Sequence, residues 1–159
     1  MIQQTPSPPL TLTARRILKA TPAQVFRAWT EPALLRSWFA VAEGYTTPVA
    51  EVDLRIGGRY RLGMQPPGSA RMDMAVGEYQ EVAPPERLVF TWQWEGAPAD
   101  APVTLVTVLF STHASGTELI LTHERFDSAA SRDQHAAGWQ GCLSQLERLL
   151  ASPAAGNSG

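Results

Sequence analysis

The fold is decided by residues 116–150, which read GTELILTHERFDSAASRDQHAAGWQGCLSQLERLL. Apolar and polar residues alternate as far as His123, which is typical of a strand with one buried face. From about Ser128 to Ala151 the apolar residues recur with helical spacing. They are Trp139, Cys142, Leu143, Leu146, Leu149 and Leu150. A helix of about 35 Å that follows several strands is expected to lie across a sheet that curls around it.

Two local features of this helix need an explanation. Ser131 and Gln134 have the spacing of a capping box and are expected to open the helix. Gly138 and Gly141 each cost about 1 kcal/mol relative to alanine inside a helix. Gly138 flanks the apolar stripe, so we expect it either to allow close packing against the sheet or to leave room for a ligand. Gly141 points further outward, and the pattern does not explain it.

The preceding residues predict one strand, two short helices and six strands. The first strand covers Leu10–Ala20. Thr21 and Gln24 form a capping box before one helix, and Pro32 starts the second. Glycine and proline turns separate the remaining strands, which we place near 47–56, 58–65, 71–82, 86–95, 103–113 and 117–125.

Composition bounds the class of protein. The chain has 159 residues, 44% of them apolar and 18% charged, which fits one globular domain over residues 10–151. We expect a disordered N-terminal tail (1–9) and a flexible C-terminal tail (152–159). A net charge of −2 without basic clusters argues against nucleic acid as a partner, and no apolar run is long enough for a membrane span. With a single cysteine, Cys142, and no signal peptide, a cytoplasmic location is expected.

Strand alternation predicts which side chains face the long helix. The inward sets are Leu88, Phe90, Trp92 and Trp94; Leu119, Leu121 and His123; Tyr60, Leu62 and Met64; and, unless a bulge intervenes, Met72, Met74, Val76 and Glu78. Several tryptophans and methionines on one concave face favour an adaptable apolar lining over a solid aliphatic core.

Several stretches resemble a known family. They are ATPAQVFRAWTEPALLRSWF (20–39), EVDLRIGGRY (51–60), GEYQEVAPPERLVFTWQW (77–94), and the segments 116–126 and 135–150. They are similar to the START/Bet v 1-like (SRPBCC) superfamily and, within it, to the group named after the activator of Hsp90 ATPase. The resemblance implies an α+β helix-grip fold, in which a curved seven-stranded antiparallel sheet wraps around a long C-terminal helix and two short helices follow the first strand.

For function the resemblance implies less. Superfamily members bind lipids, sterols and other hydrophobic molecules, and some cyclise polyketides, but the group has no invariant catalytic set to transfer. The group patterns matched by Gly138-Trp139, His123 and Gly57-Gly58 look structural or cavity-lining. Our leading hypothesis is therefore a protein that binds a small, largely hydrophobic molecule between the sheet and the C-terminal helix. The alternatives are a protein-interaction module like the Hsp90 co-chaperone domain and a cavity enzyme of the cyclase or hydrolase type.

The titratable residues support no specific chemistry. His123 is interpreted first as a hydrogen-bonded core histidine, then as a ligand contact, and last as a general acid or base. His135 shares the inner stripe and is expected either in a solvent-exposed first turn or at a cavity mouth. Cys142 lies among apolar residues, where a thiol is usually inert. We expect no metal and no cofactor, and the oligomeric state stays open, with a homodimer the commonest choice. The predicted cavity lining is Trp29, Trp38, Tyr60, Leu62, Met64, Met74, Phe90, Trp92, Trp94, Leu121, His123, His135, Gly138, Trp139 and Cys142.

Overall fold

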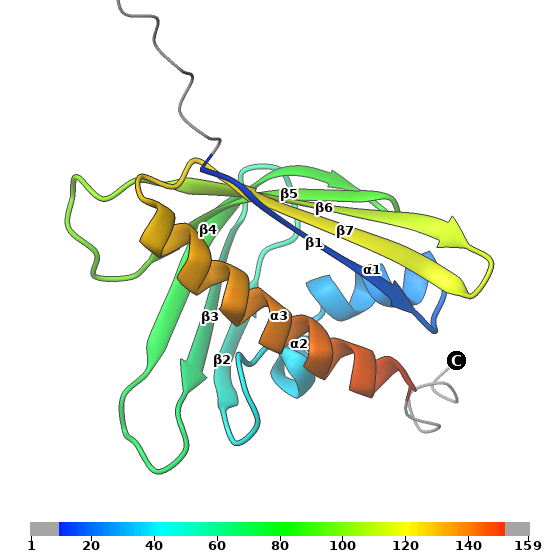
Figure 1. Cartoon of the computed structure of the whole chain (residues 1–159), viewed down its shortest axis with the longest axis horizontal. Helices are drawn as coiled ribbons and strands as arrows, with labels where there is room; N and C mark the ends of the chain where they lie inside the picture. The colour runs from blue at the N-terminus through cyan, green and yellow to red at the C-terminus, as the bar shows by residue number, and fades with distance from the viewer. Residues whose placement is uncertain (1–9, 152–159) are drawn as a thin grey trace, which may run out of the picture.

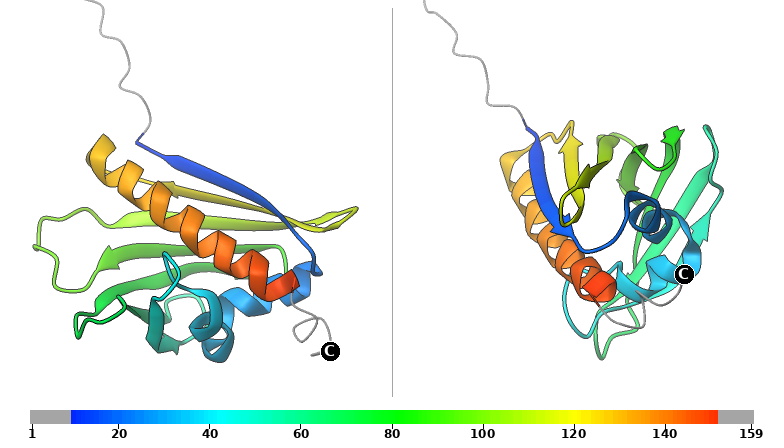
Figure 2. Two further views of the ribbon diagram at one scale, coloured as in Figure 1. Left: turned by 60° about the horizontal axis from the view of Figure 1, so that its bottom comes forward. Right: turned by 90° about the vertical axis from the view of Figure 1, so that its right-hand side faces the viewer.

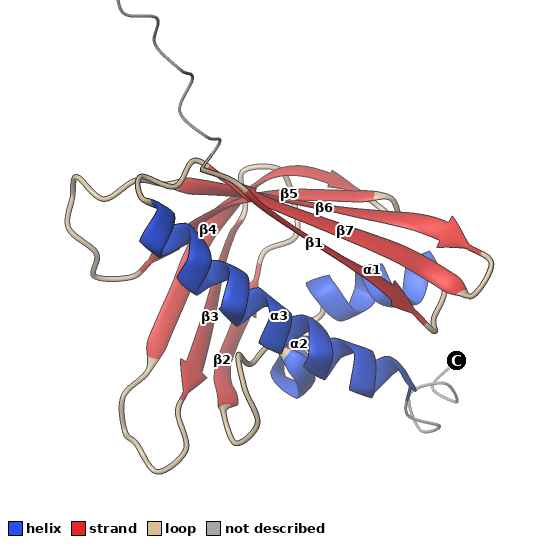
Figure 3. Cartoon of the chain, viewed as in Figure 1, coloured by secondary structure: helices blue, strands red, loops and turns tan. Residues whose placement is uncertain are grey.

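Seven strands form one antiparallel sheet, and three helices accompany it (Figures 1 and 3). The structure is a computed structural model that describes residues 10–151, so both predicted tails lie outside the described residues. The elements are β1 (Leu12–Leu18), α1 (Pro22–Thr30), α2 (Pro32–Trp38), β2 (Thr46–Val52), β3 (Arg59–Gln65), β4 (Asp73–Ala83), β5 (Arg87–Trp94), β6 (Thr104–His113), β7 (Gly116–Glu124) and α3 (Ala129–Ala151). The sheet order is β1-β7-β6-β5-β4-β3-β2, which confirms the predicted helix-grip fold.

The sheet curls so that its concave face receives the helices (Figure 2). Register shifts in β2, between Thr46 and Val49, and in β4, between Tyr79 and Glu81, mark irregularities that bend a sheet locally. Helix α3 packs against β1 at one edge of the sheet and against α2, while α1 lies over β6 and β7. The space between α3 and the middle strands is therefore enclosed on several sides.

The sequence explains where the helices begin. Thr21 Oγ1 accepts a hydrogen bond from the Gln24 backbone N–H (3.2 Å), and Gln24 Oε1 accepts one from Thr21 N–H (2.9 Å), so the predicted capping box of α1 is present. For α3 the predicted capping residue, Ser131, was wrong and lies about one turn too late in the chain. Ser128 Oγ, not Ser131, is the cap: it accepts from the Ser131 N–H at 3.1 Å, because the helix already starts at Ala129.

The predicted apolar stripe of α3 forms part of the core. Trp139, Cys142, Leu143 and Leu146 are buried, and Leu149 and Leu150 pack partly buried against the same cluster. Leu146 is completely inaccessible to solvent. The helix is therefore fixed by apolar burial along one face.

The inward face of β4 was predicted wrongly. Leu62 pairs with Ala75 and Gly63 pairs with Met74, so Met74 lies on the convex side of the sheet, away from α3. Met72, Val76 and Glu78 share the phase of Met74, whereas Ala75 and Tyr79 are buried. The prediction chose the phase that contains Met72, Met74 and Val76, but the opposite phase, with Ala75, Gly77 and Tyr79, faces inward. A side chain at Gly77 would overlap the Thr91 carbonyl oxygen and the Tyr60 ring.

The structure decides between the two roles left open for Gly138 and gives Gly141 a role that the pattern did not explain. A Cβ atom at Gly141 would overlap the carbonyl oxygen of Val41, so this glycine allows α3 to approach the backbone that follows α2. A Cβ atom at Gly138 would meet only the Val41 side chain, at an ordinary contact distance of 3.4 Å. Close packing therefore requires Gly141, while Gly138 is open to a methyl group.

This difference predicts opposite effects of the same substitution. Gly138→Ala should raise the free energy of unfolding by about 0.5–1 kcal/mol, because alanine is the better helix former. Gly141→Ala should lower it by about 1–3 kcal/mol, because the methyl group forces the helix away from Val41. Urea denaturation of both variants would measure this, and a stabilising Gly141→Ala would contradict the close approach.

Candidate functional site

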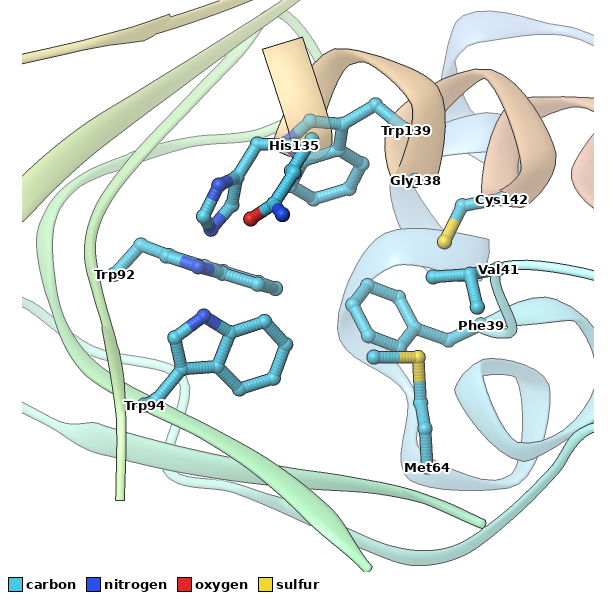
Figure 4. Close-up of a pocket in the computed structure, with 10 residues that line it drawn as sticks. Phe39, Val41, Met64, Trp92, Trp94, His135, Gly138, Trp139 and Cys142 are labelled. Carbon is cyan, nitrogen blue, oxygen red and sulfur yellow. The ribbon is translucent and has the colours of Figure 1, made fainter. Parts of the chain in front are cut away.

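A pocket of about 140 Å³ lies between the N-terminal half of α3, strand β5 and the segment after α2 (Figure 4). Its lining is Phe39, Val41, Met64, Trp92, Trp94, Gln134, His135, Gly138, Trp139 and Cys142. An engineered cavity of about 150 Å³ in another protein takes up one benzene molecule. The pocket is thus smaller than the few hundred cubic ångströms expected of a typical ligand site, and its volume suits a single six-membered ring.

Regular spacing in two elements brings most of the lining together. Trp92 and Trp94 are two residues apart on β5, so they share one face of the sheet. On α3, Gly138 and Trp139 follow His135 by three and four residues, and Cys142 follows Trp139 by three, so the four residues lie on one face of the helix. Met64 comes from β3.

Aromatic rings form the walls. The ring centroids of Trp92 and Trp139 are 5.2 Å apart, those of Phe39 and Trp139 5.9 Å, and those of Phe39 and Trp92 6.2 Å. Trp94 stands at the mouth, where it is 36% exposed and lies 6.0 Å from the His135 ring. The Phe39 and Trp139 rings meet edge to face at 81°, and the other two pairs are tilted at 51° and 48°. Such large planar rings fill a small gap less readily than flexible aliphatic chains do.

A chain of hydrogen bonds fixes Trp139 to the sheet. The Trp139 indole N–H donates to His123 Nδ1 (3.0 Å), so the neutral ring carries its proton on Nε2 and donates it to Thr104 Oγ1 (2.7 Å). The Thr104 hydroxyl in turn donates to the Trp92 carbonyl oxygen (2.9 Å). Each of the three donors has an acceptor, and the chain joins α3 to β7, β6 and β5.

His123 is fully buried within this chain. Burial, together with the nearby His135, lowers the pKa of His123 to about 3. The ring is therefore neutral near pH 7, and both of its nitrogens are used in structural hydrogen bonds. This arrangement agrees with the interpretation of His123 as a hydrogen-bonded core histidine.

His135 lines the pocket and has one nitrogen available. Its Nδ1 lies 2.8 Å from the Ser131 carbonyl oxygen, which can only accept, so Nδ1 is the donor. In the neutral ring Nε2 is then an acceptor, and nothing among residues 10–151 donates a hydrogen bond to it.

Two buried indole N–H groups have no acceptor within the described part of the chain, those of Trp29 and Trp92. Buried donors in native proteins are nearly always paired. Trp92 borders both the pocket and a second cavity of only about 20 Å³, which has room for about one water molecule. Trp29 borders the smaller cavity alone.

The predicted lining residues separate into groups. Around the pocket lie Met64, Trp92, Trp94, His135, Gly138, Trp139 and Cys142. Around the smaller cavity lie Trp29, Tyr60, Leu62 and Phe90. Trp38, Leu121 and His123 are buried in the core and border neither cavity, and Met74 lies on the convex face.

Three pocket residues were not predicted: Phe39, Val41 and Gln134. Phe39 and Val41 belong to the segment between α2 and β2, which has no periodicity from which to infer a direction. Gln134 lies one residue before His135 and could have been included as its neighbour at the mouth.

Cys142 is a buried free cysteine. Burial raises the pKa of the Cys142 thiol to about 12, with the Ala40 backbone N–H acting weakly in the opposite direction, so the thiol stays protonated. Within residues 10–151 no three His, Cys, Asp or Glu side chains are grouped so that they could hold a metal ion. In the same range no helix has the length and apolarity needed to cross a membrane.

A curled antiparallel sheet that holds a long C-terminal helix, with an apolar pocket between them, defines a helix-grip protein. The chain belongs to the family described as activator of Hsp90 ATPase homolog 1-like proteins, whose model matches residues 19–151. This confirms the resemblance seen in the sequence.

Solved structures agree. A protein of Chromobacterium violaceum is 30% identical, with a TM-score of 0.80 over 91% of this chain and 99% of the other. A protein of the same family from Silicibacter pomeroyi is 25% identical (TM-score 0.76; 89% and 97% covered). An Aeromonas hydrophila protein labelled as like this family is 23% identical and shares the fold (TM-score 0.75; 94% and 97% covered). A comparison with curated proteins gave no match.

The hydrogen-bonded chain predicts that His123 does not titrate near neutral pH. Its ring resonances should stay constant from pH 8 to pH 5 in an NMR titration, with Nδ1 unprotonated. Unfolded histidine has a pKa of about 6.5, so the unfolded chain binds a proton that the folded one does not. As the pH is lowered from about 6.5 to about 3, the free energy of unfolding should therefore decrease. This group contributes at most about 1.4 kcal/mol per pH unit to the decrease. A His123 titration midpoint near 6.5 would contradict the chain of hydrogen bonds.

Proposed function

We propose that this protein binds a small, largely hydrophobic molecule in the pocket between β5 and α3. The observation that carries the proposal is a concavity of about 140 Å³ walled by Phe39, Trp92 and Trp139 at the edge of the buried core. Protein interiors normally pack without gaps of this size. An apolar concavity with a few polar groups is the usual form of a small-molecule site.

Gly138 supports the proposal. It costs helix stability, and its neighbours leave room for a methyl group, so close packing does not explain it. It lies in the pocket wall, where any side chain would take up ligand space. The absence of a side chain here is consistent with a site kept open.

The size of the pocket limits both ligand and affinity. One ring of six carbon atoms, at no more than about 1.5 kcal/mol per atom, gives at most about 9 kcal/mol. This corresponds to a dissociation constant no tighter than about 0.3 μM. A larger ligand would extend through the mouth past Trp94 and Gln134, both of which are exposed.

A protein-interaction role is the second candidate, because the family is described by its likeness to an activator of the Hsp90 ATPase. A cavity enzyme has less support. The pocket's titratable residues are His135 and Cys142, and the Cys142 thiol is protonated.

Adding a side chain at Gly138 tests the proposal. Toluene should bind the native protein saturably, as measured by changes in tryptophan fluorescence and in the indole NMR signals. Gly138→Leu should abolish binding because the leucine fills the pocket. Ala137→Leu places the same side chain at an exposed position on the same helix and should bind as the wild type does.

Circular dichroism must show that both variants are folded. Equal binding by folded Gly138→Leu would remove this pocket as the site. No saturable binding by the wild type would contradict the proposed function and favour the protein-interaction role.

A further inference from the structure

The polar atoms of the pocket specify the ligand more closely than its apolar walls do. Resting on the proposed function, we infer that the pocket takes a single-ring molecule with a hydroxyl group, a phenol in the simplest case. The hydroxyl accepts a hydrogen bond from the Trp92 indole N–H and donates one to His135 Nε2. The ring lies against Phe39 and Trp139.

The donor is the indole N–H of Trp92. The side chain is 5% exposed, and its Nε1 has no acceptor among the described residues. An indole nitrogen can only donate, and a buried donor without a partner is costly. A ligand oxygen in the pocket that Trp92 borders would supply the missing acceptor.

The acceptor is Nε2 of His135. Its direction is fixed because Nδ1 is committed to the Ser131 carbonyl oxygen one turn earlier in α3. The ring is also held by aromatic neighbours: the centroid of Phe126 lies 5.0 Å away and that of Trp94 6.0 Å away. The acceptor is thus oriented before a ligand arrives.

Donor and acceptor belong to neighbouring rings. The centroids of Trp92 and His135 are 6.3 Å apart with an interplanar angle of 80°, and Figure 4 shows both rings on the same side of the pocket. A hydroxyl group accepts and donates through one oxygen atom, so it can serve both rings. An ether could only accept, and an alkyl group could do neither.

Charge makes a carboxylate a poor alternative. The lining contains no lysine and no arginine, and beside a neutral His135 ring a buried carboxylate would lose its hydration without gaining a cation as partner. A carboxylate also has no proton to give to His135 Nε2. A neutral hydroxyl fits this set of atoms without burying a charge.

Three ligands of similar size test the inference: phenol, anisole and toluene. Toluene is the most apolar of the three, so without specific hydrogen bonds phenol should bind more weakly than toluene. With both hydrogen bonds, phenol should bind about tenfold more tightly than toluene. A tenfold difference in affinity corresponds to the net free energy of one good hydrogen bond. Anisole should fall between them.

The indole NMR signals show directly where phenol binds. The chain has five tryptophans, and phenol should move the Trp92 N–H signal downfield, whereas toluene should not. His135→Phe keeps a ring in place but removes the acceptor, so phenol should lose its advantage while toluene still binds.

The outcomes separate the two proposals. If toluene binds saturably and phenol binds no better, the hydroxyl inference is wrong and the apolar pocket stands. If none of the ligands binds, the proposed function is wrong and the inference with it. A phenol preference that persists in His135→Phe, or an unshifted Trp92 signal in the wild type, would overturn the assignment of the two groups. The wild-type shift decides the question even if His135→Phe does not fold.

Discussion

The hydrogen-bonded chain from Trp139 through His123 and Thr104 to the Trp92 carbonyl oxygen is the constraint on which the interior depends. It spans the helix and three adjacent strands, and burial keeps His123 neutral, so the direction of each bond is defined. Because the indole of Trp139 is tied to the sheet at one end, its ring cannot swing into the space beside it. The position of α3 over the sheet and the shape of the pocket are thus linked.

A second contact sets the distance between α3 and the segment that follows α2. Gly141 lets α3 touch the backbone at Val41, and one turn earlier Gly138 leaves the wall open. The two glycines, three residues apart, therefore have different roles. Gly141 allows close packing of the helix, and Gly138 leaves space in the pocket wall. The rings of Phe39, Trp92 and Trp139 then keep this pocket from collapsing, since rigid planar groups have few ways to fill a gap.

Much of this fold could be predicted from the sequence, because helical and strand periods are local properties. The element order, the buried stripe of α3 and the capping box of α1 all follow from spacing. The inward face of β4 did not follow, because a strand with Met74 on one face and Ala75 on the other shows its direction only through its pairing with β3. Phe39 and Val41 escaped prediction because the segment that carries them has no period. Core residues such as Trp38 and Leu121 cannot be told from lining residues by pattern, since both are buried.

A crystal structure of the protein soaked with iodobenzene would test most directly whether the space between β5 and α3 admits a single ring. The iodine position can be located from its anomalous scattering without any assumption about the ligand's pose. An iodobenzene ring bounded by Phe39, Trp92 and Trp139, with the bond from Trp139 to His123 unchanged, is the predicted result. A saturated crystal with no iodine between β5 and α3, and with Trp92 or Phe39 turned into the space, would show that the interior is a closed core.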